Sequence, residues 1–519
     1  MKAKYKLGIT YILLGCSLIT MAQTKIPPIF KSSFVSISDS GSLVYTPDKQ
    51  GNALPDFSRV GYHHSDLSLP DYPVTMSISP ISGDNTQHIQ NAIDRLTQLP
   101  LDANGHRGVL LLKRGTYQVA NTIFIKSSGI VLKGEGCGNT ETLLLGTSST
   151  RYPIIKVTGE GLPREISGSR VSITDKFVPV GTFHLNVTNG SNFHSGDRVM
   201  VYRPGTIEWI QALRMDQIIE RNGTKQWSPD QYNLAFERQI VKVEGNTLYI
   251  DNPIVMQMET KYGGGQVYKY SFADRVSEVG VTDLCIESVY QNYEDANHAW
   301  TGVMIDKAEN CWVKNVTTRH IANSAVFCER YAKNITVLNC RCLEPKSVIT
   351  GGYRYSFYNN GQQNLFMSCV TTEGRHDFVT GARVLGPNVF YRCQASQTYA
   401  DIGPHHRWAC GTLYDNIITD GAINVQDRGN MGSGHGWSGV TQVLWNCSVK
   451  TAVVQSPWTT GANYSIGTKG AIGKPALPGR PSGKWEGRQE TNMQIRSLFE
   501  AQLMARKNLK LDLLNKEER

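Results

Sequence analysis

The sequence lacks several features that would point to other classes of protein. It has no run of basic residues and no basic stripe interleaved with aromatic side chains, which argues against a nucleic-acid partner despite a formal net charge of +9. It has no paired Cys-x-x-Cys spacing, so its 11 cysteines give no metal motif. The apolar run from Leu7 to Met21 is too short to remain in a bilayer as a spanning helix. The moderate positive charge is compatible with a polyanionic substrate.

The N-terminus has the pattern of an export signal. Lysines at positions 2, 4 and 6 precede the apolar run, and we place a signal peptide at residues 1–22, with cleavage after Ala22. The alternative is cleavage before Cys16, which would then carry a lipid anchor. Either way we predict an exported protein, periplasmic or secreted, without a transmembrane segment.

Six short core-type segments recur between residues 311 and 447, at intervals of 24, 29, 24, 24 and 30 residues. They are 311–316, 335–340, 364–369, 388–393, 412–417 and 442–447. A unit of this length cannot bury its own apolar face, whereas stacked neighbours can. Helical repeats would need apolar residues at three-to-four spacing over ten or more positions, which these segments lack. The pattern predicts an all-β chain folded as a parallel β-helix.

Cysteines fall at core positions of these segments. They are Cys311, Cys340, Cys369, Cys393 and Cys447. We predict that they are stacked, buried thiols. Disulfides are compatible with an oxidising compartment, but the spacing assigns no pairing.

An arginine follows the last core residue of four consecutive segments by fourteen positions. The four are Arg330, Arg354, Arg383 and Arg407. By strand alternation they should point outward, while the residues that follow each of them point inward. A row of like charges about 4.8 Å apart is unfavourable unless carboxylates or a bound anion neutralise it. The row therefore predicts an anion-binding face.

The same coils contain further polar residues that are candidates for a site. They are Arg375, His376, Asp377, Asp401, His405, His406, Arg428, His435 and Trp437, with Tyr355 beside the second arginine. Asp377 and Asp401 each lie eight positions after a core residue, so they should be neighbours in adjacent coils. Histidines close to arginines favour acid–base chemistry. The alternative for any single residue is a solvated structural ladder of acids paired with arginines.

The N-terminal third resembles a known superfamily. A helix expected from residue 84 or 86, with Ile89, Ala92, Ile93 and Leu96 on one face, is followed by four short strands with glycine turns. With the sequences at 83–86, 108–112, 115–117 and 131–136, this opening is similar to that of the pectate-lyase-like superfamily. The resemblance implies a right-handed parallel β-helix and a carbohydrate-active protein. It does not identify a reaction, because the superfamily includes lyases, glycosidases, epimerases and tailspikes.

The remaining regions divide the chain further. We expect an irregular wrap at 23–80, the capped start of the β-helix at 81–182, an inserted β subdomain at 183–269, coils with the site at 270–460, and a loop with a closing helix (490–508) at 461–519. Trp209, Trp227 and Tyr232 of the insertion would form either a sugar-stacking wall or, as the simpler alternative, the insertion's own core.

The leading functional hypothesis is an exported carbon–oxygen lyase that acts on a uronic-acid-containing polysaccharide or oligosaccharide. Arg383 and Arg407 would neutralise the uronate carboxylate, and His405 or His406 would take the C5 proton. Arg375, His376 or Tyr355 would assist the departing oxygen. The leaving group is either a sugar or a terminal hydroxyl, the latter making the enzyme a hydro-lyase of the kind that finishes ulvan-type fragments. The remaining candidates, Arg330, Arg354, Asp377, Asp401, Arg428, His435 and Trp437, would bind substrate.

Two alternatives come from other classes of function. A glycoside hydrolase would use Asp377 and Asp401 as its carboxylate pair. A non-catalytic glycan-binding protein would present an aromatic platform. No cofactor is required by the leading hypothesis, although the same two aspartates would suit Ca²⁺.

Overall fold

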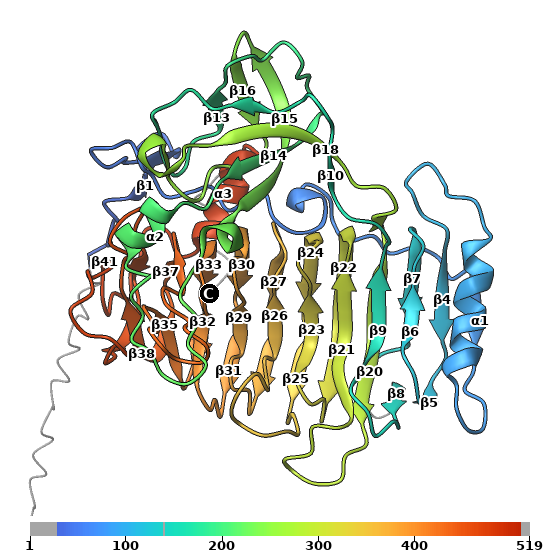
Figure 1. The fold of residues 1–519 in the computed structure, drawn as a ribbon. Coiled ribbons are helices and arrows are strands. Elements are labelled where there is room, and N and C mark those ends of the chain that lie inside the picture. The colour runs from blue at the N-terminus through green and yellow to red at the C-terminus, as the bar shows by residue number, and fades with distance from the viewer. Residues whose placement is uncertain (1–27, 139–140, 510–519) are drawn as a thin grey trace, which may run out of the picture.

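The computed structural model describes residues 28–138 and 141–509. Strands stacked in parallel form one long right-handed β-helix, with a helix at its N-terminal end and an inserted sheet against one side (Figure 1). The predicted fold class is therefore confirmed. The predicted signal peptide and Cys16, with its alternative lipid anchor, lie outside the described residues. Within the described part of the chain, no helix is long and apolar enough to cross a membrane.

Each coil contributes strands to three stacked parallel sheets. The first sheet contains β3 (Met76–Ile78), β4 (Gly108–Leu112), β7 (Ile130–Lys133), β20 (Gly280–Ser288), β22 (Ala308–Arg319), β24 (Ala332–Leu338), β27 (Leu365–Met367), β30 (Leu385–Tyr391), β33 (Ala409–Asp415), β37 (Val443–Trp445), β39 (Tyr464–Ile466) and β41 (Lys484–Glu486). The second contains β5 (Gly115–Val119), β8 (Thr142–Gly146), β25 (Arg341–Leu343), β28 (Val370–Thr372), β31 (Gln394–Ser396), β34 (Ile418–Thr419), β38 (Ser448–Val454) and β40 (Lys469–Ile472), together with the second halves of β20 and β22.

The third sheet carries the candidate site. It contains β6 (Ile123–Ile125), β9 (Tyr152–Thr158), β21 (Ala299–Asp306), β23 (Ser324–Cys328), β26 (Phe357–Asn359), β29 (Phe378–Thr380), β32 (Asp401–Pro404) and β35 (Ala422–Val425). Two short strands, β19 (Val276–Ser277) and β36 (Gly439–Val440), extend the stack.

The strand register reproduces the repeat seen in the sequence. Cys311 pairs with Ile335, Thr336 with Leu365, and Val389 with Leu413, so each core-type segment stacks on the next. The residue before the last core position turns the chain from the first sheet to the second in a left-handed conformation, for example Asn339 at φ 52°. Asparagine tolerates this region better than most residues, which explains its recurrence there.

The coil interior is a continuous apolar stack. The cysteines predicted to be buried thiols are buried and unpaired, as the sequence indicated. Aromatic rings stack between coils, with Phe366 and Phe390 4.8 Å apart and Phe390 and Tyr414 5.5 Å apart, measured between ring centroids. A disulfide joins Cys137 and Cys285, a pairing that the sequence did not assign. Each large apolar side chain that is fully buried in this stack contributes about 1.5–3 kcal/mol to stability.

Helix α1 (Thr86–Thr97) covers the N-terminal end of the stack (Figure 1). The four residues predicted for its apolar face are the ones that it buries. Before it, the chain runs back along the molecule, from a bridge between Phe30 and Met493 near the C-terminal coils to β3 at the N-terminal end. This strap includes β1 (Val35–Ile37), β2 (Leu43–Tyr45) and the 3-10 turn Tyr62–Ser65.

The C-terminal helix differs from its prediction. We expected residues 490–508 to close the end of the stack, but helix α3 spans Leu498–Arg506 and packs with the strap on the outward side of the first sheet. Phe499 lies 5.4 Å from Tyr391 between ring centroids. The physical reason is that the first sheet carries an apolar row on its outer face, which needs covering. That row is Leu365, Val389, Leu413 and Val443.

The insertion is an antiparallel sheet that packs against the coils. It contains β10 (Arg164–Glu165), β11 (Val171–Ser172), β13 (His184–Asn186), β14 (Arg198–Arg203), β15 (Leu234–Glu244), β16 (Thr247–Ile250) and β18 (Gln266–Ser271), with the pair β12 (Phe177–Val178) and β17 (Met258–Glu259), helix α2 (Ile207–Leu213) and the 3-10 turns Pro229–Tyr232 and Thr260–Tyr262. It starts earlier than residue 183, because β10 pairs with the last strand, β18.

The insertion's aromatic residues form its core. Trp209, Trp227 and Tyr232 are buried, and Trp209 lies 5.0 Å from Trp408 of the coils between ring centroids. The simpler alternative in the sequence analysis was therefore right, and these residues form no sugar-stacking wall. Their burial against Trp408 fixes the insertion beside the third sheet.

Candidate functional site

A cleft of about 760 Å³ opens on the outward face of the third sheet. Side chains of β23 and β26 form its floor, and the glycine-rich loop 428–436 forms one wall. Arg221 of the insertion supports that wall, since its guanidinium donates to the Gly432 carbonyl oxygen at 2.9 Å. The cleft is thus bounded by the coils, the loop and the insertion together.

A hydrogen-bonded tyrosine–histidine pair lies in this cleft. The Tyr355 hydroxyl lies 3.0 Å from His405 Nε2, and both side chains are largely buried. Tyr355 precedes β26 and His405 follows β32, so the pair spans coils that the stack brings together. His405 Nδ1 is buried and has no hydrogen-bond partner among the described residues. The pair can exchange a proton between a phenol oxygen and an imidazole nitrogen.

Behind this pair, Asp401 contacts both His376 and Arg428. His376 Nδ1 lies 3.0 Å from Asp401 Oδ1, and Arg428 donates to Asp401 Oδ2. Burial alone would raise the pKa of Asp401, but Arg428 and His376 outweigh it and lower that pKa. Asp401 therefore stays ionised and fixes the orientation of both partners.

Two further histidines complete the cluster. The His405 ring centroid lies 5.0 Å from those of both His406 and His435, which are 4.8 Å from each other. Arg407 donates to Ser433 in the loop at 2.8 Å. Gly432 has a left-handed φ of 54°, and a Cβ there would lie 2.1 Å from the His435 ring. Glycine is thus required where the loop passes over His435.

Burial keeps these histidines neutral. It lowers the pKa of His406 to about 3 and that of His435 to about 4, and the neighbouring arginines add to the effect. Burial and the surrounding cationic groups also lower the pKa of His405 strongly. A neutral imidazole can accept a proton, whereas an imidazolium cannot. The histidines are therefore unprotonated near neutral pH, and a bound anionic group, by raising their pKa values, would make them stronger bases.

The cleft is cationic at its polar end. Arg375, Arg428 and Arg221 line it, and no carboxylate is among its lining residues in the described chain. Arg375 also donates to the Gly351 carbonyl oxygen. An anionic group that enters this end meets guanidinium groups and neutral imidazoles.

The other end of the cleft has an aromatic floor that the sequence analysis missed. Phe327 and Tyr358 are register partners on β23 and β26, with rings stacked 4.4 Å apart, and both line the cleft. Stacked aromatic faces suit the apolar faces of sugar rings. The sequence signal for these two residues was their outward position in strands of alternating pattern. Because the loop before β26 is long, counting from the first-sheet core residues does not place Tyr358 next to Phe327.

The predicted row of four arginines is wrong at one position. Val326 pairs with Phe357, 31 residues later, because the loop before β26 is seven residues longer than the first-sheet interval of 24 implies. Arg354 consequently falls before β26 and is fully buried, donating to the Ser347 carbonyl oxygen at 2.9 Å from Nε. It cannot contact a substrate.

Trp437 is a second correction. It is fully buried with the insertion's core, and its Nε1 donates to the Leu213 carbonyl oxygen at 3.3 Å. The insertion covers the face of the coil from which Trp437 projects. It therefore has no surface to offer a ligand.

The two aspartates occupy equivalent positions, as expected, but different surroundings. The register pairs Val379 with Gly403, which places Asp377 level with Asp401. Asp377 is buried, and its Oδ1 accepts hydrogen bonds from Ser356 and Thr371 at 3.1 Å. Burial raises its pKa to about 7. Asp401 is engaged by Arg428 and His376, so the two carboxylates do not face each other across the cleft.

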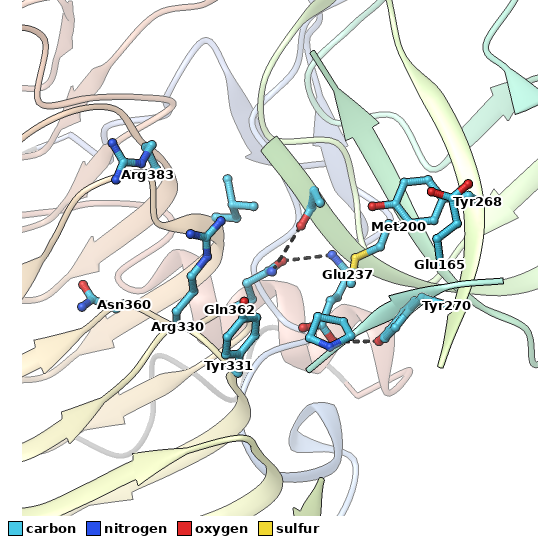
Figure 2. Close-up of a pocket in the computed structure, with 13 residues that line it drawn as sticks. Glu165, Met200, Glu237, Tyr268, Tyr270, Arg330, Tyr331, Asn360, Gln362 and Arg383 are labelled. Carbon is cyan, nitrogen blue, oxygen red and sulfur yellow. Dashed lines mark hydrogen bonds between the residues drawn. The ribbon is translucent and has the colours of Figure 1, made fainter. Parts of the chain in front are cut away.

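Arg330 and Arg383 lie in a neighbouring pocket of about 170 Å³, between the coils and the insertion (Figure 2). Arg407 links this pocket to the cleft, since its carbonyl oxygen accepts from the Arg383 backbone N–H at 2.9 Å. The predicted residues are thus divided between two adjacent sites, with Arg407 at their boundary.

Potential metal ligands come close together at one place among the described residues. The group of three found there is Cys137, Glu141 and Cys285, and the two cysteines form the disulfide. Asp377 and Asp401 are not part of any such group. Binding of Ca²⁺ by these two aspartates stays a prediction.

The fold and cleft define a parallel β-helix protein with a lateral polar cleft. No family model matches the chain, and no curated protein matches it. Solved structures with a similar fold include the tailspike protein gp49 of Pseudomonas phage LKA1, with 14% identity, 75% of this chain and 63% of that chain covered, and a TM-score of 0.45. This chain thus spans less than two thirds of that tailspike.

Two enzymes give comparable matches. An alginate lyase from Paenibacillus matches at 11% identity, with 80% of this chain and 98% of that chain covered and a TM-score of 0.34. The catalytic domain of a GH87 alpha-1,3-glucanase matches at 10% identity, with 82% and 69% covered and a TM-score of 0.36. At such low similarity, activity has to be argued from the site itself.

Proposed function

We propose that this protein is a carbon–oxygen lyase that acts by β-elimination on a uronic-acid-containing polysaccharide or oligosaccharide. One observation carries the proposal: a neutral tyrosine–histidine pair lies in a cleft lined by arginines and by no carboxylate of the described chain. Elimination needs a base for a weakly acidic carbon-bound proton and fixed cations for the charge that develops on the uronate. The cleft offers both.

The reaction balances within the pair Tyr355 and His405. The C5–H bond breaks, its electrons form the C4–C5 double bond, and the C4–O bond breaks. The pair takes up the C5 proton with His405 as the group that gains positive charge, and Tyr355 passes a proton to the departing oxygen. Transfer of a proton from His405 to the Tyr355 oxygen, along their hydrogen bond, then restores the starting protonation state. In this proposal Arg375 and Arg428, which line the cleft, would neutralise the uronate carboxylate in place of Arg383, which lies in the neighbouring pocket, and of Arg407.

The remaining residues have positioning roles in this proposal. Asp401 holds His376 and Arg428, and Arg407 holds the loop through Ser433. Phe327 and Tyr358 would stack against a neighbouring sugar ring. A sugar as leaving group makes the enzyme a polysaccharide lyase, and a hydroxyl makes it a hydro-lyase; both use the same proton transfers.

A glycoside hydrolase is less well supported. It needs two carboxyl groups roughly 5–9.5 Å apart on opposite sides of the glycosidic bond. Asp377 is buried beneath Ser356 and Thr371, and Asp401 is paired with Arg428. The aromatic floor suits a glycan-binding protein, but binding alone gives no role to a buried, neutral histidine cluster.

Incubation of the purified protein with ulvan, pectin and glycosaminoglycans tests the proposal. We expect absorbance at about 235 nm from the conjugated uronate product of elimination. New reducing ends without this absorbance would replace the proposal with hydrolysis. Binding without either product would leave a glycan-binding protein.

A further inference from the structure

The pocket beside the cleft contains two arginines that lack carboxylate partners. It lies between the insertion and coils, with Arg330, Arg383 and Asn360 on the coil side (Figure 2). Arg330 is exposed and forms no ion pair within the described residues. The Arg383 guanidinium contacts the Tyr232 ring, 5.6 Å from its centroid, and has no acidic partner in the same described chain.

The acidic groups at this pocket are engaged elsewhere. Glu237 receives hydrogen bonds from Arg275 at 2.6 Å and from the Tyr270 hydroxyl at 2.7 Å. Glu165 is held by Arg170, whose Nε donates to it at 2.9 Å. The pocket therefore presents two uncompensated positive charges in a partly enclosed space, an arrangement that is unfavourable without an anion.

The pocket continues the surface of the cleft. Phe327 and Tyr358 line the cleft, while Arg330 and Asn360, two or three residues further along the same chain segments, line the pocket. At about 3.3 Å per residue, the two sites are separated by roughly 7–10 Å. Gly381 lies against both segments, since a Cβ there would lie 2.7 Å from the Tyr358 hydroxyl and 2.3 Å from Asn360 Oδ1.

We propose that this pocket is a second subsite, which binds an anionic group, a carboxylate or a sulfate ester, on a sugar two positions along the chain from the one that reacts, beyond the reach of a dimer. The inference rests on the proposed function for the identity of the cleft. Arg330 and Arg383 would form charged hydrogen bonds to that group, and the insertion would close over it. The substrate is then a chain with repeated negative charges, and an isolated uronate is too short to use both sites.

The test measures binding without turnover, in a His405→Ala background. Fluorescently labelled oligogalacturonate hexamers and dimers, a chondroitin sulfate hexamer and neutral maltohexaose are titrated at low salt. We expect Arg330→Ala/Arg383→Ala to weaken binding of the anionic hexamers by roughly tenfold or more, and to leave dimers unchanged. A greater loss for chondroitin sulfate than for oligogalacturonate identifies sulfate as the preferred group, and equal losses identify carboxylate.

Matched variants separate charge from folding. Arg95→Ala/Arg341→Ala removes two exposed arginines away from the site, and should bind like the parent. Arg330→Lys/Arg383→Lys keeps the charge and should retain most of the affinity, provided that its melting temperature matches the parent. The subsite is refuted if the parent binds no anionic hexamer, if hexamers and dimers lose affinity equally, or if the control pair has the same effect.

The two proposals fail separately. If elimination occurs but Arg330 and Arg383 do not affect hexamer binding, the lyase stands and the subsite falls. If the arginine-dependent binding is found but no polymer gives an unsaturated product, the subsite stands and the lyase falls.

Discussion

His405 and Tyr355 show how the stack creates a reactive pair from residues fifty positions apart. Tyr355 precedes β26 and His405 follows β32. Their hydrogen bond of 3.0 Å exists only because successive coils superimpose. Burial within the cluster of rings keeps His405 neutral. The chemistry of this pair is therefore a property of its surroundings as much as of its residue types.

Replacing His405 tests its proposed role directly. His405→Ala should lower kcat on the active polymer by about 10²–10⁴-fold, the range for loss of a general acid–base group. His184→Ala, an exposed histidine of the insertion, is the matched control and should leave kcat unchanged. Activity that persists in His405→Ala would place the reaction elsewhere.

The pH profile should report the lowered histidine pKa values. Because burial lowers the pKa of His406 to about 3 and that of His435 to about 4, neither charges above about pH 5. We expect kcat/KM to stay level from about pH 8 to about pH 5.5, without the loss near pH 6.5 that ordinary histidines would cause. Bound anionic substrate raises histidine pKa values, so the acid limb of kcat should lie at higher pH than that of kcat/KM.

In the proposed reaction, guanidinium groups supply the positive charge that a metal ion could otherwise provide. Arg375 and Arg428 line the cleft and carry permanent charge. We therefore propose that dialysis against EDTA leaves the initial rate of product absorbance unchanged, and that added Ca²⁺ does not increase it. A rate that falls with EDTA and returns with Ca²⁺ would require a metal in the proposal.

At the scale of elements, β23 and β26 supply the aromatic floor because their outward positions are in register. Phe327→Ala should raise KM about threefold to tenfold with little change in kcat, since stacking contributes about 0.5–1.5 kcal/mol. Phe124→Ala is a matched control on the outward face of β6, in the same sheet but outside the cleft. A fall in kcat instead of a rise in KM would assign Phe327 a role in the chemical step.

The strands also show where the alignment of successive coils, as predicted from the sequence, was right and where it was wrong. Counting from core residues correctly placed Arg383 and Arg407 at equivalent positions of adjacent coils, because β29 and β32 are offset by the same 24 residues as the first sheet. The same count failed for Arg354, where the loop before β26 is longer. The core interval constrains only the strands that form the core, and loops between sheets change length without disturbing it.

At the scale of the whole molecule, the solenoid buries acidic groups that titrate near neutral pH. Burial raises the pKa of Asp377 to about 7, above the ordinary value near 4. Between these values the folded state holds a proton that the unfolded state has released, so this group's contribution to stability is present at low pH and is lost as pH rises to about 7.

Asp377→Asn should remove that pH dependence. The asparagine imitates the protonated carboxyl and keeps the hydrogen bonds from Ser356 and Thr371. Relative to wild type, the free energy of unfolding should rise by about 1.4 kcal/mol per pH unit between about pH 4 and pH 7, then level off. Denaturant melts at several pH values measure it. Parallel curves for the two proteins would mean that Asp377 is ionised in the folded state.

The sequence by itself determined the parallel β-helix, its buried cysteines, the apolar face of its first helix and the zone in which histidines and arginines gather. These follow from a repeat whose core must stack and from strong local periodicity. Only the tertiary structure decided which side chains share a surface. Loop lengths set the register of the third sheet, which buried Arg354, and the insertion folded over the coils, which buried Trp437 and separated the arginine pocket from the histidine cleft.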